Sequence, residues 1–181
     1  MPTMHRIVSE GYIRIVEGNI TQQEVDAIVN AANPSLMGGG GVDGAIHRAG
    51  GPTILEGCRE IRRSRYPEGL PTGQAVATTA GNLPARWVIH TVGPVYSRSE
   101  DRSELLTSCH TESLRIADEL GATTVAFPAI STGIYGYPLD EAADVAIWAV
   151  RRVETSVEVK EVRFVLFGEK AFEAFERALG G

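Results

Sequence analysis

Short apolar runs, rich in β-branched residues and bounded by Gly, Pro or Asn, recur along the chain. Such runs are typical of buried strands, because a strand covered on both faces needs apolar side chains at successive positions. They predict strands at Tyr12–Val16, Val25–Ala31, Gln74–Ala80, Trp87–Val92, Thr124–Phe127 and Val162–Phe167.

Helical patterns lie between and after these runs. Apolar side chains repeat at three- and four-residue spacing in two segments, which places each set on one face of a helix that packs against a core. A third segment, 142–153, is apolar nearly all round, which predicts a well-buried helix. The alternation of strands and helices predicts a three-layer α/β/α domain with a mostly parallel sheet. The two repeating sets are Leu106, Cys109, Ser113, Ile116 and Leu120, and Phe172, Phe175 and Leu179.

Composition and charge narrow the class of protein. A chain of 181 residues, 43% hydrophobic and 22% charged, suits one domain spanning 1–181 with a substantial core. No apolar run is long enough to span a bilayer, and residues 1–10 lack the apolar core of a signal peptide, so we expect a cytoplasmic protein. The net charge of −6 makes broad nucleic-acid binding unlikely, and the basic cluster at 59–65 is expected to be a solvated helix face. Cys58 and Cys109 lack the spacing of a disulfide scaffold or a zinc site and are expected in the core, and no metal is predicted.

Four unusual segments each follow the end of a predicted strand. They are Gly18–Thr21, Asn33–Asp43, Ile130–Gly136 and Phe167–Gly168. In open α/β sheets, ligands bind at the carboxyl ends of the strands, so these segments are expected to meet at one ligand site.

The segment 38–41 is four consecutive glycines, placed between a strand and a helix that begins near Val42. Glycines let several backbone N–H groups converge on one anion, and a helix N-terminus adds free donors and partial positive charge. A diphosphate is the expected ligand. A mobile linker or a tight turn are the alternatives.

Three common nucleotide and hydrolase motifs fit poorly. Residues 39–44 satisfy G-x-G-x-x-G, but the region where a Rossmann unit needs a second strand ending in an acid reads as a charged helix, 58–65. No P-loop lysine follows a glycine run, and Ala129 replaces the first glycine of a nucleophile elbow.

The chain resembles the macro domain family, in particular its MacroD-type branch, nearly from end to end. The resemblance implies a mixed central sheet, a cleft for ADP-ribose, no cofactor, and hydrolysis of ADP-ribosyl esters, either O-acetyl-ADP-ribose or ADP-ribosylated acidic side chains of proteins. The motifs that carry it are Gly18–Thr21, Val25–Asn33, Gly38–His47, Val88–Pro94 and Ser131–Pro138.

The catalytic residues that the resemblance implies lie at the distal ribose. Asp43 falls in the first turn of the helix after the glycines, where it could serve as an N-cap or as the general base that activates water. Asn33 matches the family asparagine that holds the ribose hydroxyls, although it would also suit a turn before Pro34. Tyr135 is expected to pack over the ribose or to act as a hydrophobic lid. Whether Asp43 or a substrate phosphate orients the water stays open.

The remaining binding residues lie on the two loops and at the adenine. Phe167 is expected to stack on adenine, with a core position as the alternative. Asn19 departs from the family, in which Asp commonly accepts a hydrogen bond from the adenine amino group. An amide oxygen can still accept, without charge assistance, so we expect weaker or less selective adenine binding. The other predicted ligand-binding residues are Ile20, Gly40, Gly41, Val42, Ser131, Thr132, Gly133 and Ile134.

The histidines are expected to support the structure around the site and in the core. His47 lies one turn after Asp43 and is expected to contact it or to pack structurally. His90 is expected as a hydrogen-bonded core residue, His110 on a helix surface, and Asn30 in a structural role. Two other functions stay open: a module that binds ADP-ribose without hydrolysis, and a phosphatase acting on ADP-ribose 1″-phosphate.

Overall fold

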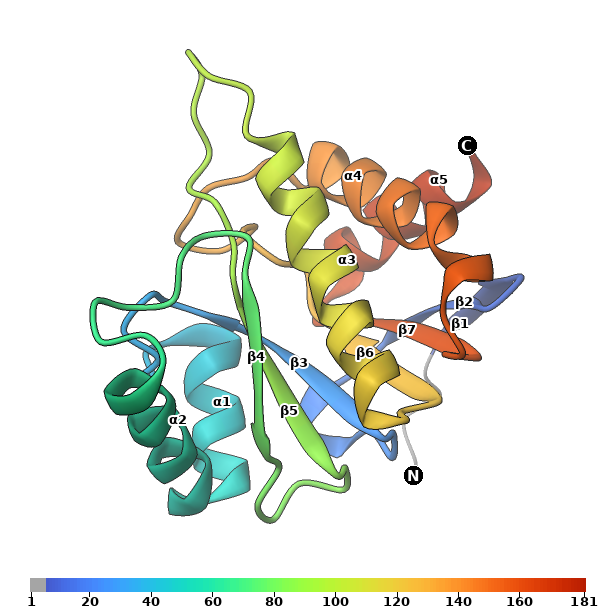
Figure 1. Cartoon of the computed structure of the whole chain (residues 1–181). Coiled ribbons are helices and arrows are strands. Elements are labelled where there is room, and N and C mark those ends of the chain that lie inside the picture. The colour runs from blue at the N-terminus through green and yellow to red at the C-terminus, as the bar shows by residue number, and fades with distance from the viewer. Residues whose placement is uncertain (1–5) are drawn as a thin grey trace.

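The computed structural model describes residues 6–181, which form a sheet of seven strands in the order β1-β2-β7-β6-β3-β5-β4 (Figure 1). The strands from β2 to β5 in that order are parallel to their neighbours, whereas β1 and β4 are antiparallel at the two edges. Their bounds are β1 Ile7–Glu10, β2 Ile13–Glu17, β3 Ala27–Ala32, β4 Ala75–Thr79, β5 Trp87–Val92, β6 Thr124–Phe127 and β7 Glu161–Leu166.

Helices cover both faces of the sheet. One face packs against α1 and α2, and the other against α3, α4 and α5 (Figure 1). Successive strand residues serve opposite faces, so that Ile28 belongs to the core under α1 and α2 while Val29 belongs to the core under α3 to α5. The predicted three-layer, mostly parallel fold is confirmed. The helices are α1 Gly41–Gly50, α2 Pro52–Ser64, α3 Ser103–Leu120, α4 Leu139–Arg152 and α5 Glu169–Gly180, with short 3₁₀ turns η1 Ile20–Gln22 and η2 Glu154–Ser156.

Each predicted strand is present: Trp87–Val92 and Thr124–Phe127 have the predicted ends, and the ends of the other four differ by one or two residues. The edge strand β1 was missed, because its side chains are exposed or half-buried and the segment lacks the apolar run of a buried strand. The helix α4 is not buried all round: Asp144 and Trp148 are exposed, since only one face meets the core. Within residues 6–181, no helix is long and apolar enough to cross a membrane.

The prediction for His110 is wrong. Its side chain is buried, stacks on Phe127 with ring centroids 5.2 Å apart, and bonds through Nδ1 to the Leu106 carbonyl at 2.8 Å. Burial lowers the pKa of this histidine to about 4. The buried stripe of α3 includes the position four residues after Leu106, which the apolar pattern did not mark because histidine is polar. Cys58 and Cys109 are free and buried, as expected.

Candidate functional site

The sheet order places the four strand-end segments in a row. Along the carboxyl edge, Asn19 follows β2, Phe167 follows β7, the 130–136 loop follows β6, and the glycine loop follows β3. The first two are tied together, since the Gly18 amide donates to the Leu166 carbonyl at 2.9 Å. The row therefore has an aromatic end, two loops in the middle, and a carboxylate end at Asp43.

The glycine loop offers unpaired donors at the start of α1. The N–H groups of Gly39, Gly40, Gly41 and Val42 donate to no oxygen within residues 6–181. Gly40 is the N-cap residue and no side chain caps the helix, so the capping alternative for Asp43 does not apply. Gly41 has φ of 58°, a left-handed conformation that glycine adopts without strain. The loop therefore leaves free N–H donors at an uncapped helix N-terminus, an arrangement that suits an anion.

The second loop, 130–136, lies close to Gly93, the residue that follows β5. Ser131 takes a left-handed φ of 69° and is buried, and its hydroxyl has no hydrogen-bond partner among the described residues. A methyl group on Gly93 would lie 2.2 Å from that hydroxyl oxygen, so a side chain at this position would displace Ser131. Thr132 donates to the Ala129 carbonyl at 2.8 Å, while Gly133 and Ile134 are exposed at the tip. Tyr135 is half-buried, and its carbonyl accepts from the Tyr96 amide at 2.8 Å.

Asp43 is the one buried carboxylate among the described residues. Its Oδ1 accepts from Asn30 Nδ2 at 2.9 Å and lies 3.4 Å from His47 Nε2. Loss of hydration raises the pKa of Asp43, and the Asn30 hydrogen bond and the charge of His47 oppose this rise. A carboxyl group that has a raised pKa and lies at the edge of the sheet where a ligand is expected is a candidate general base.

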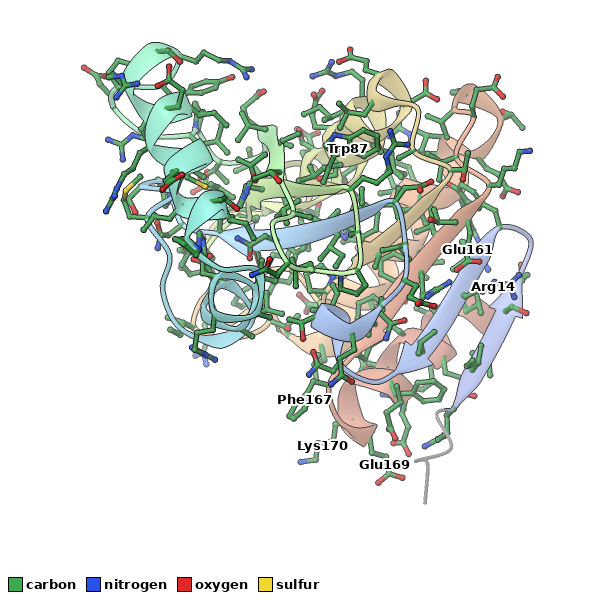
Figure 2. All side chains as sticks on the ribbon, turned by 90° about the horizontal axis from the view of Figure 1, so that it is seen from below. Arg14, Trp87, Glu161, Phe167, Glu169 and Lys170 are labelled. Atoms are coloured by element: carbon green, nitrogen blue, oxygen red, sulfur yellow. The ribbon has the colours of Figure 1, made fainter. Side chains whose placement is uncertain are left out.

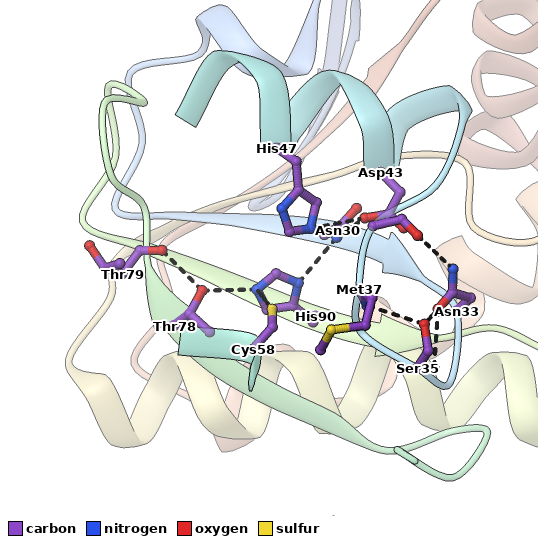
Figure 3. A network of polar contacts seen from close by, with 11 residues as sticks. Asn30, Asn33, Ser35, Met37, Asp43, His47, Cys58, Thr78, Thr79 and His90 are labelled. Carbon is purple, nitrogen blue, oxygen red and sulfur yellow. Dashed lines mark hydrogen bonds and ion pairs between the residues drawn. The ribbon is translucent and has the colours of Figure 1, made fainter. Parts of the chain in front are cut away.

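Behind Asp43 lies a polar network that the sequence pattern did not reveal (Figure 3). Asn30 and His90 are paired in the register of β3 and β5, and Asn30 Nδ2 lies 3.1 Å from His90 Nδ1. His90 Nε2 contacts Thr78 Oγ1 at 2.9 Å, and the more distant Cys58 Sγ at 3.7 Å. Two polar residues inside otherwise apolar strands were the available signal, but their pairing depends on sheet register.

Asn33 makes the turn that its sequence context allowed. Its Oδ1 accepts from the Ser35 amide at 3.1 Å and from the Ser35 hydroxyl, and its Nδ2 donates to the Gly38 carbonyl at 2.9 Å (Figure 3). One amide proton stays available for a ligand. The turn and a contact with a ribose are therefore compatible.

The aromatic end is open to solvent. Phe167 is 90% exposed, which rules out the core alternative, and Figure 2 shows its side chain standing clear of the ribbon where β7 ends. Asn19 Oδ1 accepts from both the Thr21 amide at 2.9 Å and the Thr21 hydroxyl at 2.7 Å. Because an amide oxygen has two lone pairs, both are engaged, and Asn19 presents its NH₂ donor instead. Ile20 is buried and can offer only its main chain.

One cluster has the residue types of a metal site. Ligand atoms of His47, Cys58 and His90 lie within 4.8 Å of one another, although these residues are far apart in sequence. In the arrangement observed, both nitrogens of His90 are engaged by Asn30 and Thr78, and burial raises the pKa of the Cys58 thiol to about 12. The His90 nitrogens are therefore committed to hydrogen bonds, and the Cys58 thiol keeps its proton.

The fold and this edge define an α/β/α domain whose candidate ligand site lies at the carboxyl ends of parallel strands. A sequence profile of the Macro domain matches residues 29–146. The chain belongs to the macro domain family.

Relatives of this chain include curated proteins of high identity. A macro domain-containing protein of Streptomyces nogalater is 66% identical over 168 residues, covering 93% of this chain and 92% of its own. The O-acetyl-ADP-ribose deacetylase of Escherichia coli K12 is 50% identical over 169 residues, covering 92% and 94%.

Solved structures share the fold. The macrodomain of Oceanobacillus iheyensis with ADP has a TM-score of 0.90 at 41% identity, with 98% of this chain and 94% of that chain covered. The Trypanosoma brucei macrodomain in complex with ADP-ribose has a TM-score of 0.84 at 38% identity, covering 93% and 69%.

Proposed function

We propose that this protein binds ADP-ribose and hydrolyses its esters, either O-acetyl-ADP-ribose or mono-ADP-ribose on acidic side chains of proteins. The observation that carries the proposal is the buried Asp43 carboxylate, whose pKa is raised, at the start of a helix whose neighbouring N–H groups are free. The relative named as an O-acetyl-ADP-ribose deacetylase, at 50% identity, supports it.

The row of segments suggests how the ligand lies. Adenine stacks on Phe167 beside Asn19 and the main chain of Ile20, and the diphosphate lies between the two loops, where it takes the free N–H groups of the glycine loop. The distal ribose then falls beside Asn33, Asp43 and Tyr135. This order follows the order of the strands β2, β7, β6 and β3 in the sheet. The loop residues assigned to the diphosphate are Gly40, Gly41, Val42, Ser131, Thr132, Gly133 and Ile134.

The chemistry is ordinary ester hydrolysis. Water adds to the acyl carbon while Asp43 takes one of its protons, and the carbonyl π electrons move onto oxygen. The intermediate then collapses and breaks the bond between the acyl carbon and the ribose oxygen, which takes the proton back from Asp43. The products are a carboxylic acid and ADP-ribose, and the aspartate is regenerated.

A time course with O-acetyl-ADP-ribose and a glutamate-ADP-ribosylated protein tests this function, with free ADP-ribose measured by chromatography. We expect release by the wild type and a large loss in Asp43→Asn, which keeps the size of the side chain. Calorimetry with ADP-ribose shows whether that variant still binds.

Absence of release from both substrates, with ADP-ribose still bound, would make this chain a binding module. Release of inorganic phosphate from ADP-ribose 1″-phosphate, without ester cleavage, would make it a phosphatase. The Asp140→Asn variant is a matched control, because Asp140 is exposed on α4 and pairs only with Arg177.

A further inference from the structure

The two oxygens of Asp43 have different surroundings. Oδ1 accepts the Asn30 amide at 2.9 Å and faces His47 at 3.4 Å. Oδ2 faces the glycine loop: a methyl group on Gly39 would lie 3.4 Å from this oxygen and equally far from Asn33 Nδ2. One oxygen is thus held by the protein, and the other lies on the side of the ribose-binding candidate Asn33.

The protons of the network can be assigned from its acceptors. Thr78 Oγ1 donates to the Thr79 carbonyl at 3.0 Å, so toward His90 it must accept. The proton of the neutral His90 ring therefore lies on Nε2, and Nδ1 is an acceptor. Burial lowers the pKa of His90 to about 3, which keeps the ring neutral.

This tautomer fixes the Asn30 amide. With Nδ1 of His90 accepting, Asn30 must turn its NH₂ group toward it, and the second proton of that group reaches Asp43 Oδ1. A flipped amide would set an oxygen against both an acceptor nitrogen and a carboxylate. The observed orientation leaves Asn30 Oδ1 buried without a partner among residues 6–181, so the network outweighs the loss of that bond.

We propose that Asn30 is a positioning residue for Asp43, locked by the Nε2–H tautomer of His90 and by Thr78, and that it leaves Oδ2 as the oxygen that meets water. The placement of water at Oδ2 rests on the proposed function. The lock, by which we mean the hydrogen bonds that link Thr78, His90, Asn30 and Asp43, does not depend on that function. It runs from β4 through β5 and β3 to α1, and so ties the carboxylate to the centre of the sheet.

The groups that face Asp43 come from three other positions. His47 lies on α1, Cys58 on α2 and His90 on β5, and the Asp43 charge contributes to the raised pKa of the Cys58 thiol. Among the described residues, Asn30 makes the shortest contact with Asp43, at 2.9 Å, whereas His47 lies 3.4 Å away. Removal of the Asn30 side chain should raise the pKa of Asp43 further, because the hydrogen bond to Asn30 lowers it.

Steady-state kinetics of Asn30→Ala and Thr78→Val across pH test the lock. We expect kcat to fall about ten- to a hundredfold in Asn30→Ala and less in Thr78→Val, with KM little changed, as fits loss of a hydrogen bond to a charged group. In both variants the acid limb of the pH profile should move to higher pH. The control is Thr91→Val, which removes a buried hydroxyl of β5 that donates to the Gln74 carbonyl outside the network.

Two measurements are independent of turnover. Nitrogen NMR of wild-type His90 should show a protonated Nε2 and a bare Nδ1, and carboxyl NMR should show a higher Asp43 pKa in Asn30→Ala. A protonated Nδ1, or an unchanged Asp43 pKa and pH profile with only a lower Tm, would overturn the lock. A wild type without esterase activity would overturn the proposed function alone, since these spectra still report on the lock.

Discussion

The carboxylate end and the aromatic end of the strand edge differ in how their polar groups are held. At β3, Asp43 is buried and bonded through Asn30 to a network that crosses three strands. At β2 and β7, Phe167 is 90% exposed, and among the described residues the Asn19 side chain bonds only to Thr21, within its own turn. A group that must react benefits from fixed direction and low hydration, whereas a surface that stacks a flat base needs only an accessible ring. We therefore expect changes at the first end to alter turnover and changes at the second to alter affinity.

The substitution Asp43→Asn gives the strongest test of this difference between the two ends. Removing a general base should lower kcat by about a hundred- to ten-thousandfold, while ADP-ribose binding stays within a few-fold of the wild type. Stopped or quenched time courses give kcat, and calorimetry gives Kd. If Kd rises as steeply as kcat falls, the two ends do not divide binding from chemistry.

Phe167→Ala should show the opposite pattern. Loss of a stacking ring costs about 1–3 kcal/mol, which corresponds to a roughly 5- to 150-fold weaker Kd for ADP-ribose. Turnover at saturating substrate should stay close to that of the wild type. Because the ring is exposed, the Tm should not change, and Phe167→Leu serves as a control that keeps apolar contact without aromatic stacking. Equal affinity in all three proteins would place the base elsewhere.

Turnover should also depend on pH in a way that binding does not. Because the pKa of Asp43 is raised, the carboxylate takes up a proton at a higher pH than an ordinary aspartate, so kcat should fall as the pH drops through that raised value. ADP-ribose affinity, which we propose to depend mostly on Phe167 and main-chain donors, should change little over the same range. Parallel pH series of kcat and Kd make the comparison, and a common titration in both would contradict it.

The smallest expected effect is that of Asn19→Asp. The new carboxylate would keep one oxygen on Thr21 and present the second as an acceptor, where the amide now presents a donor. ADP-ribose should bind about two- to tenfold more tightly, as fits one charge-assisted hydrogen bond at an exposed position. The selectivity against inosine diphosphate ribose, which lacks the exocyclic amino group, should also rise. Unchanged affinity and selectivity would remove Asn19 from the base site.

The fold and the edge that holds the site could be predicted from the sequence, but the contacts inside the site could not. Buried strands such as Trp87–Val92 carry their own apolar signal, and parallel strands bring their carboxyl ends to one edge, so the meeting of the four segments at that edge could be predicted. The pairing of Asn30 with His90 could not, because register between strands 60 residues apart is decided by packing of the whole sheet.

Local hydrogen bonds were the second feature that the sequence could not predict. The residue type at position 19 predicted a weaker acceptor, but only the structure shows that Thr21 engages both lone pairs of its oxygen. His110 illustrates the same limit in the core, where a polar residue lies on the buried stripe of α3 because its ring stacks on Phe127.

The pairing of Asn30 with His90 also bears on how the chain reaches its native state. A slip of β3 by one residue against β5 would turn Asn30 to the opposite face of the sheet, among the apolar side chains under α3 to α5. There it would find neither His90 nor Asp43, and a buried amide without partners is costly. The same two side chains therefore discriminate against misaligned intermediates during folding. The ring signals of His90 offer a direct probe of when the central strands acquire their final alignment.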